Sequence, residues 1–213
     1  MRLTGEQLGV TEPGLVHVVD DDQAVRDSLE FLLESAGLGT RTYASATEFL
    51  DAAGALESGC ILTDVRMPDI DGLALQKRLA ALGSHLPVIV MTGHGDVPIA
   101  VEALKSGATD FLEKPFDDVY LLAVIRGALQ SSEKTREATS LRNRVTTRLD
   151  TLTPREREVL VRLVDGQPNK AIALDLGTSP RTVEVQRARV MEKMAAKSLT
   201  ELVRMILETG MLR

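Results

Sequence analysis

Short apolar runs alternate with helix-like stretches over the first 130 residues of the chain. Runs rich in β-branched and aliphatic residues predict five strands, over 15–20, 38–43, 60–64, 87–92 and 109–113. Apolar positions that recur every three or four residues predict a helix after a strand, as in Val25, Leu29, Leu32, Leu33 and Ala36. Strands that alternate with helices in this way build a parallel sheet covered on both faces, so the first half is an α/β domain.

Capping residues mark where several of these helices begin. Ser45 and Glu48 form a capping box for the helix after the second strand. Asp71 precedes the third helix, and Asp22 is the expected N-cap of the first. The fourth helix is expected over about 97–106, and the fifth follows Pro115 and runs to about 130.

The remaining residues predict helices only. Residues 131–148 are charged and rich in hydroxyl groups, without Gly or Pro, and we expect a partly helical linker there. Four helices are then expected to begin near 154, 169, 180 and 199, from capping signals at Thr153, Pro154, Glu156, Ser179, Pro180, Ser198 and Glu201. A short helix, a break at Gly177 and a longer helix together indicate a helix-turn-helix. The expected domains are therefore 14–130 and 149–213, joined by the linker over 131–148.

The net charge of −6 conceals two halves of opposite sign. Residues 1–130 carry 9 Lys and Arg against 20 Asp and Glu, whereas residues 131–213 carry 16 against 11. The two halves are therefore expected to have different partners, and the basic half could meet nucleic acid.

Composition argues against a membrane span and a disulfide framework. No apolar run reaches the ~20 residues that a bilayer requires, and the N-terminal residues lack the basic-then-apolar order of a signal peptide. Cys60 is the single cysteine, and its apolar neighbours indicate a core position. A reducing, cytoplasmic location without membrane contact is the simplest interpretation.

Polar side chains follow the predicted strands at the points where they end. The first strand ends at Asp20 and Asp21, the third at Asp64, the fourth at Thr92, and Lys114 follows the fifth. Because ligands bind beyond the carboxyl ends of parallel strands, these side chains are expected to converge on one rim. Crowded carboxylates need a cation between them, and hard oxygen ligands suit Mg²⁺. Such a site with a lysine and a hydroxyl matches phosphoryl transfer, and Asp64 is the central candidate for the acceptor.

The segments VVDDD, TDVRMPDIDG and MTGHGDVPIAVEALKSGATDFLEKPF resemble the receiver domain of bacterial two-component response regulators. The resemblance covers about residues 14–130 and implies a flavodoxin-like (βα)5 fold with strand order 2-1-3-4-5. It implies that Asp64 accepts a phosphoryl group from a sensor histidine kinase, with Thr92 and Lys114 in contact with that group. The implied Mg²⁺ ligands are Asp20, Asp21, Asp64 and the backbone carbonyl of Arg66. Phe111 would occupy the aromatic switch position and swing inward together with Thr92.

Two other kinds of site fit these residues less well. Gly93-His94-Gly95 could suggest a dinucleotide loop, but Pro98 stands where the third glycine is needed, so His94 is expected to be a loop residue near the rim. A phosphotransferase acting on small molecules would want a second catalytic aspartate two residues after the nucleophile, where Arg66 stands. We therefore do not expect the chain to be an enzyme.

The longer helix of the helix-turn-helix, over about 180–195, has an apolar and a polar side. At 100° per residue Val183, Val190, Met191 and Met194 fall together and indicate core. Arg187 falls near that side, where we expect an ion pair with Glu156 or Glu158.

The polar side offers candidate DNA contacts. Those expected to reach bases are Glu184, Val185 and Ala188, and those expected to hold phosphates are Arg181, Gln186, Arg189, Lys193 and, from the preceding helix, Lys170. Arg189 could instead read guanine. A four-helix interaction module with a solvated charged face, as in a signalling adaptor, fits the same periodicity.

The segment LTPREREVLVRLVDGQPNKAIALDLGTSPRTVEVQRARVMEKM resembles the LuxR-type helix-turn-helix, over about 149–213. With its receiver, the chain is similar to response regulators of the FixJ type, through GHGDVPIAVEALKSGA, FLEKPF, PNKAIA and SPRTVEV. The resemblance implies a transcriptional regulator that forms a homodimer on phosphorylation, binds promoter DNA and contacts RNA polymerase. Release of an inhibitory contact between the domains is an equally available switch.

The recognition helix departs from the FixJ pattern at two positions. FixJ proteins tend to carry His where Gln186 stands and Asn where Arg189 stands. The resemblance implies nitrogen-fixation genes as targets, and the alternative is the same architecture regulating a catabolic or other stress operon.

Overall fold

The structure is a computed structural model that describes residues 14–53, 56, 58–93 and 97–210. It divides into two compact units, with the division after Arg136, and each unit is described by itself. Within these described residues, no helix is both long and apolar enough to cross a membrane.

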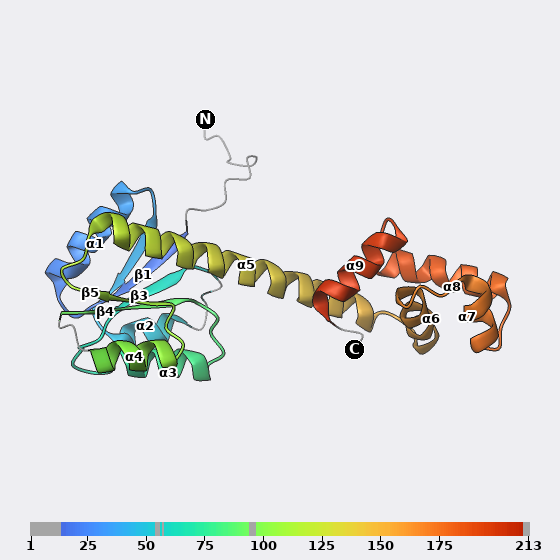
Figure 1. The fold of residues 1–213 in the computed structure, drawn as a ribbon, viewed down its shortest axis with the longest axis horizontal. Helices are drawn as coiled ribbons and strands as arrows, with labels where there is room; N and C mark the ends of the chain where they lie inside the picture. Colours follow the sequence, from blue (N-terminus) through green and yellow to red (C-terminus); the bar gives the residue numbers. More distant parts are fainter. Residues whose placement is uncertain (1–13, 54–55, 57, 94–96, 211–213) are drawn as a thin grey trace, which may run out of the picture. The chain divides into compact units, whose positions relative to one another are not determined.

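A five-stranded parallel sheet forms the centre of the first unit (Figure 1). The strands are β1 (Leu15–Val19), β2 (Gly39–Tyr43), β3 (Cys60–Asp64), β4 (Val88–Thr92) and β5 (Asp110–Glu113). They pair in the order β2-β1-β3-β4-β5, which confirms the expected topology, and each lies within one residue of its expected bounds. Since both faces are covered, β3 and β4 are buried along their whole length, which explains their continuous apolar runs.

Helices cover the sheet on both sides (Figure 1). One face carries α2 (Ala46–Ala53), α3 (Gly72–Ala81) and α4 (Val97–Lys105), and its core includes Phe49 and Leu75. The other face carries α1 (Gln23–Ser35) and the first part of α5 (Asp118–Asp150), with Leu33 and Ile125 in its core. This arrangement leaves the carboxyl ends of the strands for the polar residues that follow them.

Capping residues start the helices largely as expected. Asp22 and Asp71 are the N-caps of α1 and α3. Ser45 accepts from the Glu48 amide at 3.1 Å, but the Glu48 carboxylate accepts from Ala44 rather than from Ser45. The same displaced pattern recurs in the second unit, where Glu201 bonds the Lys197 amide. These two expected boxes are therefore half right, with the return bond moved one residue outward.

The fifth helix does not end near 130 as expected, because α5 is one helix of 33 residues that also includes the segment expected to be a partly helical linker. Neither Gly nor Pro interrupts residues 131–148, and no other breaker ends the helix near 130. The division between the units falls inside α5, and Leu141, Val145 and Leu149 pack against the core of the second unit. The helical unit thus takes in residues well before 149.

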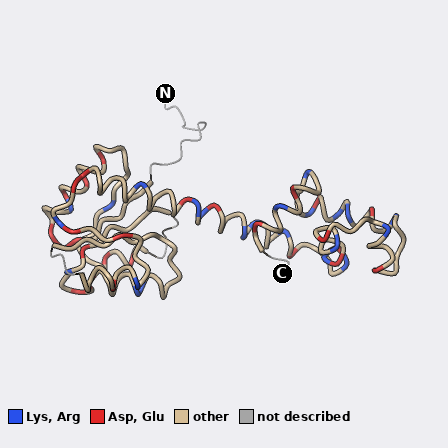
Figure 2. The backbone as a smooth tube through the Cα atoms, viewed as in Figure 1, with Lys and Arg blue, Asp and Glu red and all other residues tan. Residues whose placement is uncertain are grey.

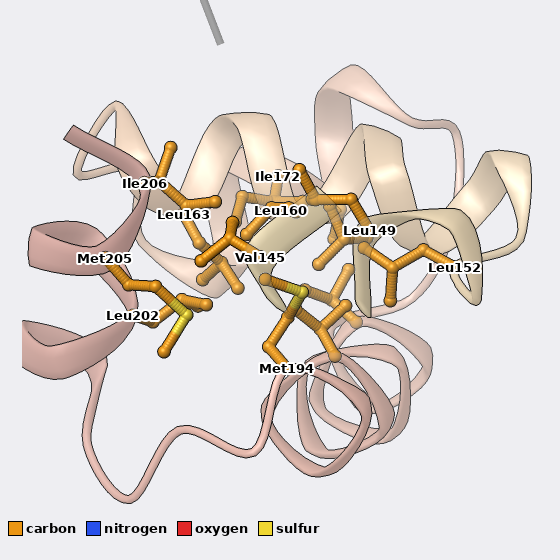
Figure 3. Packing of buried hydrophobic residues seen from close by; sticks show 14 residues of the cluster. Val145, Leu149, Leu152, Leu160, Leu163, Ile172, Met194, Leu202, Met205 and Ile206 are labelled. Carbon is orange, nitrogen blue, oxygen red and sulfur yellow. The ribbon is translucent and has the colours of Figure 1, made fainter. Parts of the chain in front are cut away.

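The second unit consists of the end of α5 with four shorter helices around one apolar core (Figure 3). These are α6 (Pro154–Val164), α7 (Asn169–Asp175), α8 (Pro180–Lys193) and α9 (Leu199–Thr209). Thr153 and Glu156 form a complete capping box at α6, and Ser179 caps α8. Gly177 has a φ of 60°, the left-handed conformation that favours glycine, and it separates α7 from α8.

Candidate functional site

Lys114 joins two acidic residues at the carboxyl end of the sheet. Its Nζ lies 2.7 Å from Asp20 Oδ2 and 2.7 Å from Asp64 Oδ1. Asp20 follows β1, Asp64 ends β3 and Lys114 follows β5. Lys114 is 94 positions from Asp20 and 50 positions from Asp64 along the chain, so the topology of the sheet brings the three side chains together. The predicted convergence of these three side chains on one rim agrees with this geometry.

The carboxylate of Asp64 is fixed through both oxygens. Lys114 holds Oδ1, and the backbone N–H of Arg66 donates to Oδ2 at 2.6 Å. A Cβ at Gly72 would collide with the backbone carbonyl of Asp64, so only glycine lets α3 start so close to the end of β3. The acid is therefore pre-oriented, and 8% of its surface is accessible.

Electrostatics keep the Lys114 ammonium charged. Burial by itself lowers the pKa of Lys114, but the hydrogen bonds and negative charges of Asp20 and Asp64 outweigh it and raise the pKa. A permanent positive charge beside a partly accessible carboxylate suits the approach of an anionic group.

Asp21 does not join the other two acids. It is exposed, and in the part of the chain that the structure describes no three acidic, histidine or cysteine side chains form a metal-binding group. Asp20 turns inward because Asp22 N–H donates to its Oδ1 and Lys114 holds its Oδ2, so the next side chain in the turn points outward. The expected set of three carboxylate ligands is thus not assembled in the structure.

Thr92 and Phe111 lie on neighbouring strands near the rim. Thr92 ends β4 and is buried, and its carbonyl accepts from the Lys114 amide at 2.7 Å. Phe111 is partly buried and packs against the core that includes Ala103 of α4. His94, expected near the rim, lies outside the described residues.

Arg26 and Asp69 are contacts of the rim that the sequence analysis missed. Arg26 Nη1 donates to the backbone carbonyl of Asp20 at 2.7 Å. Asp69 accepts from the Thr47 hydroxyl at 2.6 Å, which ties the loop after β3 to the start of α2 and helps to lower the pKa of Asp69 to about 2. Neither contact has a local sequence signal, because each joins elements through the fold.

Cys60 is a core residue, as expected. It has no exposed surface, and burial raises the pKa of its thiol to about 12, so it is protonated and unreactive at neutral pH.

The second unit carries many basic residues (Figure 2). Most of the expected DNA contacts are exposed: Lys170 on α7, and Arg181, Glu184, Val185, Ala188 and Arg189 on α8. The opposite side of α8 packs into the core through Val183 and Val190, as its periodicity predicted. Gln186 is half-buried, and its Oε1 is buried without a hydrogen-bond partner in the structure.

Two cations on α8 make contacts inside the second unit. The expected ion pair of Arg187 is wrong, because Arg187 donates to Asn169 at 3.5 Å and Lys193 takes the Glu156 carboxylate at 2.6 Å. Lys193 also donates to the Thr151 carbonyl at 3.0 Å. Its ammonium is thus engaged inside the unit, and its expected contact with phosphate stays a prediction. Since it lies at the end of α8 rather than its middle, it reaches the start of α6, where the contact lowers the pKa of Glu156.

Comparison with known proteins places both units. Residues 16–126 match the response regulator receiver domain, and residues 150–206 match the bacterial regulatory proteins of the luxR family. The chain is 60% identical over 195 residues to the transcriptional regulatory protein FixJ of Azorhizobium caulinodans, covering 92% of each. It is 50% identical over 203 residues to FixJ of Bradyrhizobium diazoefficiens, covering 95% of this chain and 99% of that protein. Its structure resembles that of the response regulator StyR, with a TM-score of 0.83 and 38% identity over 92% of this chain and 99% of that one.

The fold, the rim and these matches define a transcription factor of the two-component systems, not an enzyme. A family model matches each of its two domains. The chain belongs to the response regulators of the FixJ type, which join a receiver domain to a LuxR-type DNA-binding domain.

Proposed function

We propose that Asp64 accepts a phosphoryl group from a phosphohistidine of a sensor histidine kinase. The supporting observation is the Lys114 ammonium held 2.7 Å from both Asp20 and Asp64, beside an acceptor whose two oxygens are already oriented. In the transfer, the phosphorus–nitrogen bond of the donor breaks while a phosphorus–oxygen bond to the Asp64 carboxylate forms. The product is a mixed anhydride, and the imidazole leaves with its electron pair and takes up a proton.

The side chains around Asp64 have defined tasks in this transfer. Lys114 offers its positive charge to the phosphoryl oxygens, and the Arg66 N–H keeps the carboxylate from rotating away from the incoming phosphorus. Thr92 offers a hydroxyl at the end of the neighbouring strand. Phe111, with no hydroxyl of its own, changes position through burial alone, so the apolar environment near α4 drives its inward state.

The oxygen donors at this rim fit Mg²⁺, which the receiver family uses for phosphorylation. Asp20 and Asp64 already converge on a cation, so the pair tolerates a positive charge between its members. Asp20, Asp64 and, after rotation of the exposed carboxylate, Asp21 would hold the ion, with the Arg66 carbonyl as a further ligand. When bound, the ion would neutralise charge on the phosphoryl oxygens.

Mass spectrometry tests the assignment of the acceptor. Incubation of the full chain with acetyl phosphate and MgCl₂ should add one phosphate, lost on treatment with hydroxylamine. Asp64→Asn should add none. Asp110→Asn, at the opposite end of β5 from the rim, should behave as the wild type. A phosphate gained by Asp64→Asn would refute the assignment.

The second half of the proposal is that phosphorylation controls promoter binding through α8. The exposed face of α8, with Glu184, Val185 and Ala188 between Arg181 and Arg189, supports base contacts flanked by phosphate contacts. A homodimer formed on phosphorylation would place two such helices on two half-sites and multiply weak affinities. Sedimentation of the chain before and after phosphorylation separates this switch from release of an inhibitory contact. A phosphorylated chain that stays a monomer and still gains DNA affinity would rule out activation by dimerisation.

The proposal for the target genes rests on the relatives rather than on the site. Similarity to FixJ over nearly the whole chain supports a FixJ-like set of nitrogen-fixation genes, with RNA polymerase as the partner at the promoter. Gln186 and Arg189 lie on α8 at the two positions that depart from the FixJ pattern. They therefore support the alternative of a catabolic or other stress operon. Cytoplasmic location accords with such a regulator. Genomic footprinting of the phosphorylated protein decides between the two sets of targets.

A further inference from the structure

The last turns of α5 are built into the second unit. Leu141, Val145 and Leu149 recur at four-residue spacing and pack into its core, where Val145 has no exposed surface. Figure 3 shows Val145 and Leu149 among side chains from the other helices. The end of α5 is thus fixed against this unit by apolar contacts.

Two cations join this end of α5 to the C-terminal turn of α8. Arg148 on α5 donates from Nη1 to the backbone carbonyl of Met194, the C-cap of α8, at 3.0 Å. In the reverse direction, Lys193 of α8 donates to the Thr151 carbonyl, just past the end of α5, at 3.0 Å. Each bond satisfies a carbonyl at a helix end that has no partner within its own helix, and a cation is favoured there by the helix dipole.

Apolar packing sets which side of α8 faces the core, since Val183, Val190 and Met194 are buried there. The hydrophobic effect itself is not directional, so polar contacts at the helix end add to the definition of its register. Hydrogen bonds are directional, and those at Met194 and Lys193 act at the same end of α8. They therefore define where the exposed residues near the middle of the helix lie.

We infer that Arg148 is a positioning residue for DNA recognition, because it holds the Met194 carbonyl and so fixes the register of α8 against the end of α5. The inference rests on the proposed role of α8 as the recognition helix. Arg148 itself touches no base or phosphate in this account. Base contacts require placement within a fraction of an ångström, so they weaken when the helix shifts, whereas phosphate contacts by flexible cations tolerate the shift.

The chain offers a matched control for the charge of Arg148. Arg142 lies on the same part of α5, is exposed, and at 100° per residue falls on the other flank of the apolar stripe. Arg142→Ala removes the same charge without removing a contact to α8. Arg148→Lys keeps both the charge and a donor for the carbonyl, and so serves as the conservative variant.

The experiment measures binding of the full chain, treated with acetyl phosphate and MgCl₂, to two fluorescent duplexes. One is a 30-base-pair duplex selected from a random library by the wild-type protein, and the other is a scrambled duplex of the same composition. Affinity is measured by anisotropy over a series of KCl concentrations, and folding by circular dichroism. Arg148→Ala should lose about tenfold in affinity for the selected duplex. It should keep its affinity for the scrambled one and its salt dependence, while Arg142→Ala and Arg148→Lys stay within about threefold of the wild type.

Each other result overturns the inference. Unchanged selectivity in Arg148→Ala would show that the contact does not position α8. A salt slope lower by about one, with equal losses on both duplexes, would make Arg148 a phosphate contact. An unfolded Arg148→Ala would make the contact a requirement for folding instead. If the library yields no duplex that the wild type prefers, the proposed DNA recognition itself fails, which is distinguishable from all of these.

Discussion

The buried histidine of β1 should make the stability of the receiver domain depend on pH. His17 has no exposed surface, packs against the rings of Tyr43 and Phe49, and places Nδ1 3.2 Å from the Tyr43 hydroxyl. Burial, with a smaller effect of the Arg41 charge, lowers the pKa of His17 to about 4. The ring is therefore neutral in the folded protein at neutral pH.

The sign and size of the effect follow from the difference between the folded and unfolded pKa. The unfolded chain titrates His17 near 6.5, so between pH 6.5 and 4 it binds a proton that the folded domain does not. The free energy of unfolding is thus unaffected by His17 above pH 6.5 and falls by up to ~1.4 kcal/mol per pH unit below it. This amounts to a loss of about 2 kcal/mol at pH 5 relative to pH 8.

Tyrosine fluorescence reports on this domain alone within the full chain. Tyr43 and Tyr120 are the only tyrosines, both lie in the first unit, and the sequence has no tryptophan. Urea unfolding at pH 8 and pH 5 should show a loss about 2 kcal/mol smaller in His17→Gln, whose amide does not titrate. His85→Gln, at an exposed position, should lose as much as the wild type. Equal losses in His17→Gln and the wild type would show that His17 does not cause the pH dependence.

Two substitutions test how the rest of the structure is held. Gly72→Ala should destabilise the receiver by ~1–3 kcal/mol and slow phosphorylation, because its Cβ displaces the Asp64 carbonyl; an unchanged urea midpoint in tyrosine fluorescence would contradict this. Leu149→Ala should cost the second unit about 2–5 kcal/mol in thermal unfolding followed by circular dichroism. The exposed Leu174→Ala should cost less than ~0.5 kcal/mol, and similar costs for both leucines would show that α5 does not belong to that core.

The sequence predicted the features that depend on local chemistry and on topology. Apolar runs located the inner strands β1, β3 and β4, because a sheet covered on both faces needs continuous apolar residues there. The edge strands β2 and β5 are less apolar and less buried, but β-branched and aromatic residues still marked them. The proximity of Asp64 and Lys114 could also be predicted, because parallel strands all end at the same edge of the sheet. The caps at Asp22 and Asp71 act within two or three residues of themselves, so they too could be predicted.

Features set by tertiary contacts could not be predicted in this way. A helix without breakers can end anywhere, and α5 continues because Val145 and Leu149 find a core in the second unit. Lys193 rather than Arg187 meets Glu156, because position along α8 decides which cation reaches α6. The outward position of Asp21 depends on contacts made by its neighbours in the turn, which no spacing rule encodes.

We propose that a phosphoryl group on Asp64 controls DNA binding by the second unit. The decisive measurement is the affinity of the full chain for the selected duplex before and after treatment with acetyl phosphate and MgCl₂, in the wild type and in Asp64→Asn. The wild type should gain roughly tenfold or more in affinity, and Asp64→Asn should gain none. An equal gain in Asp64→Asn, or no gain in a wild type that mass spectrometry shows to be phosphorylated on Asp64, would rule out control by this phosphoryl group.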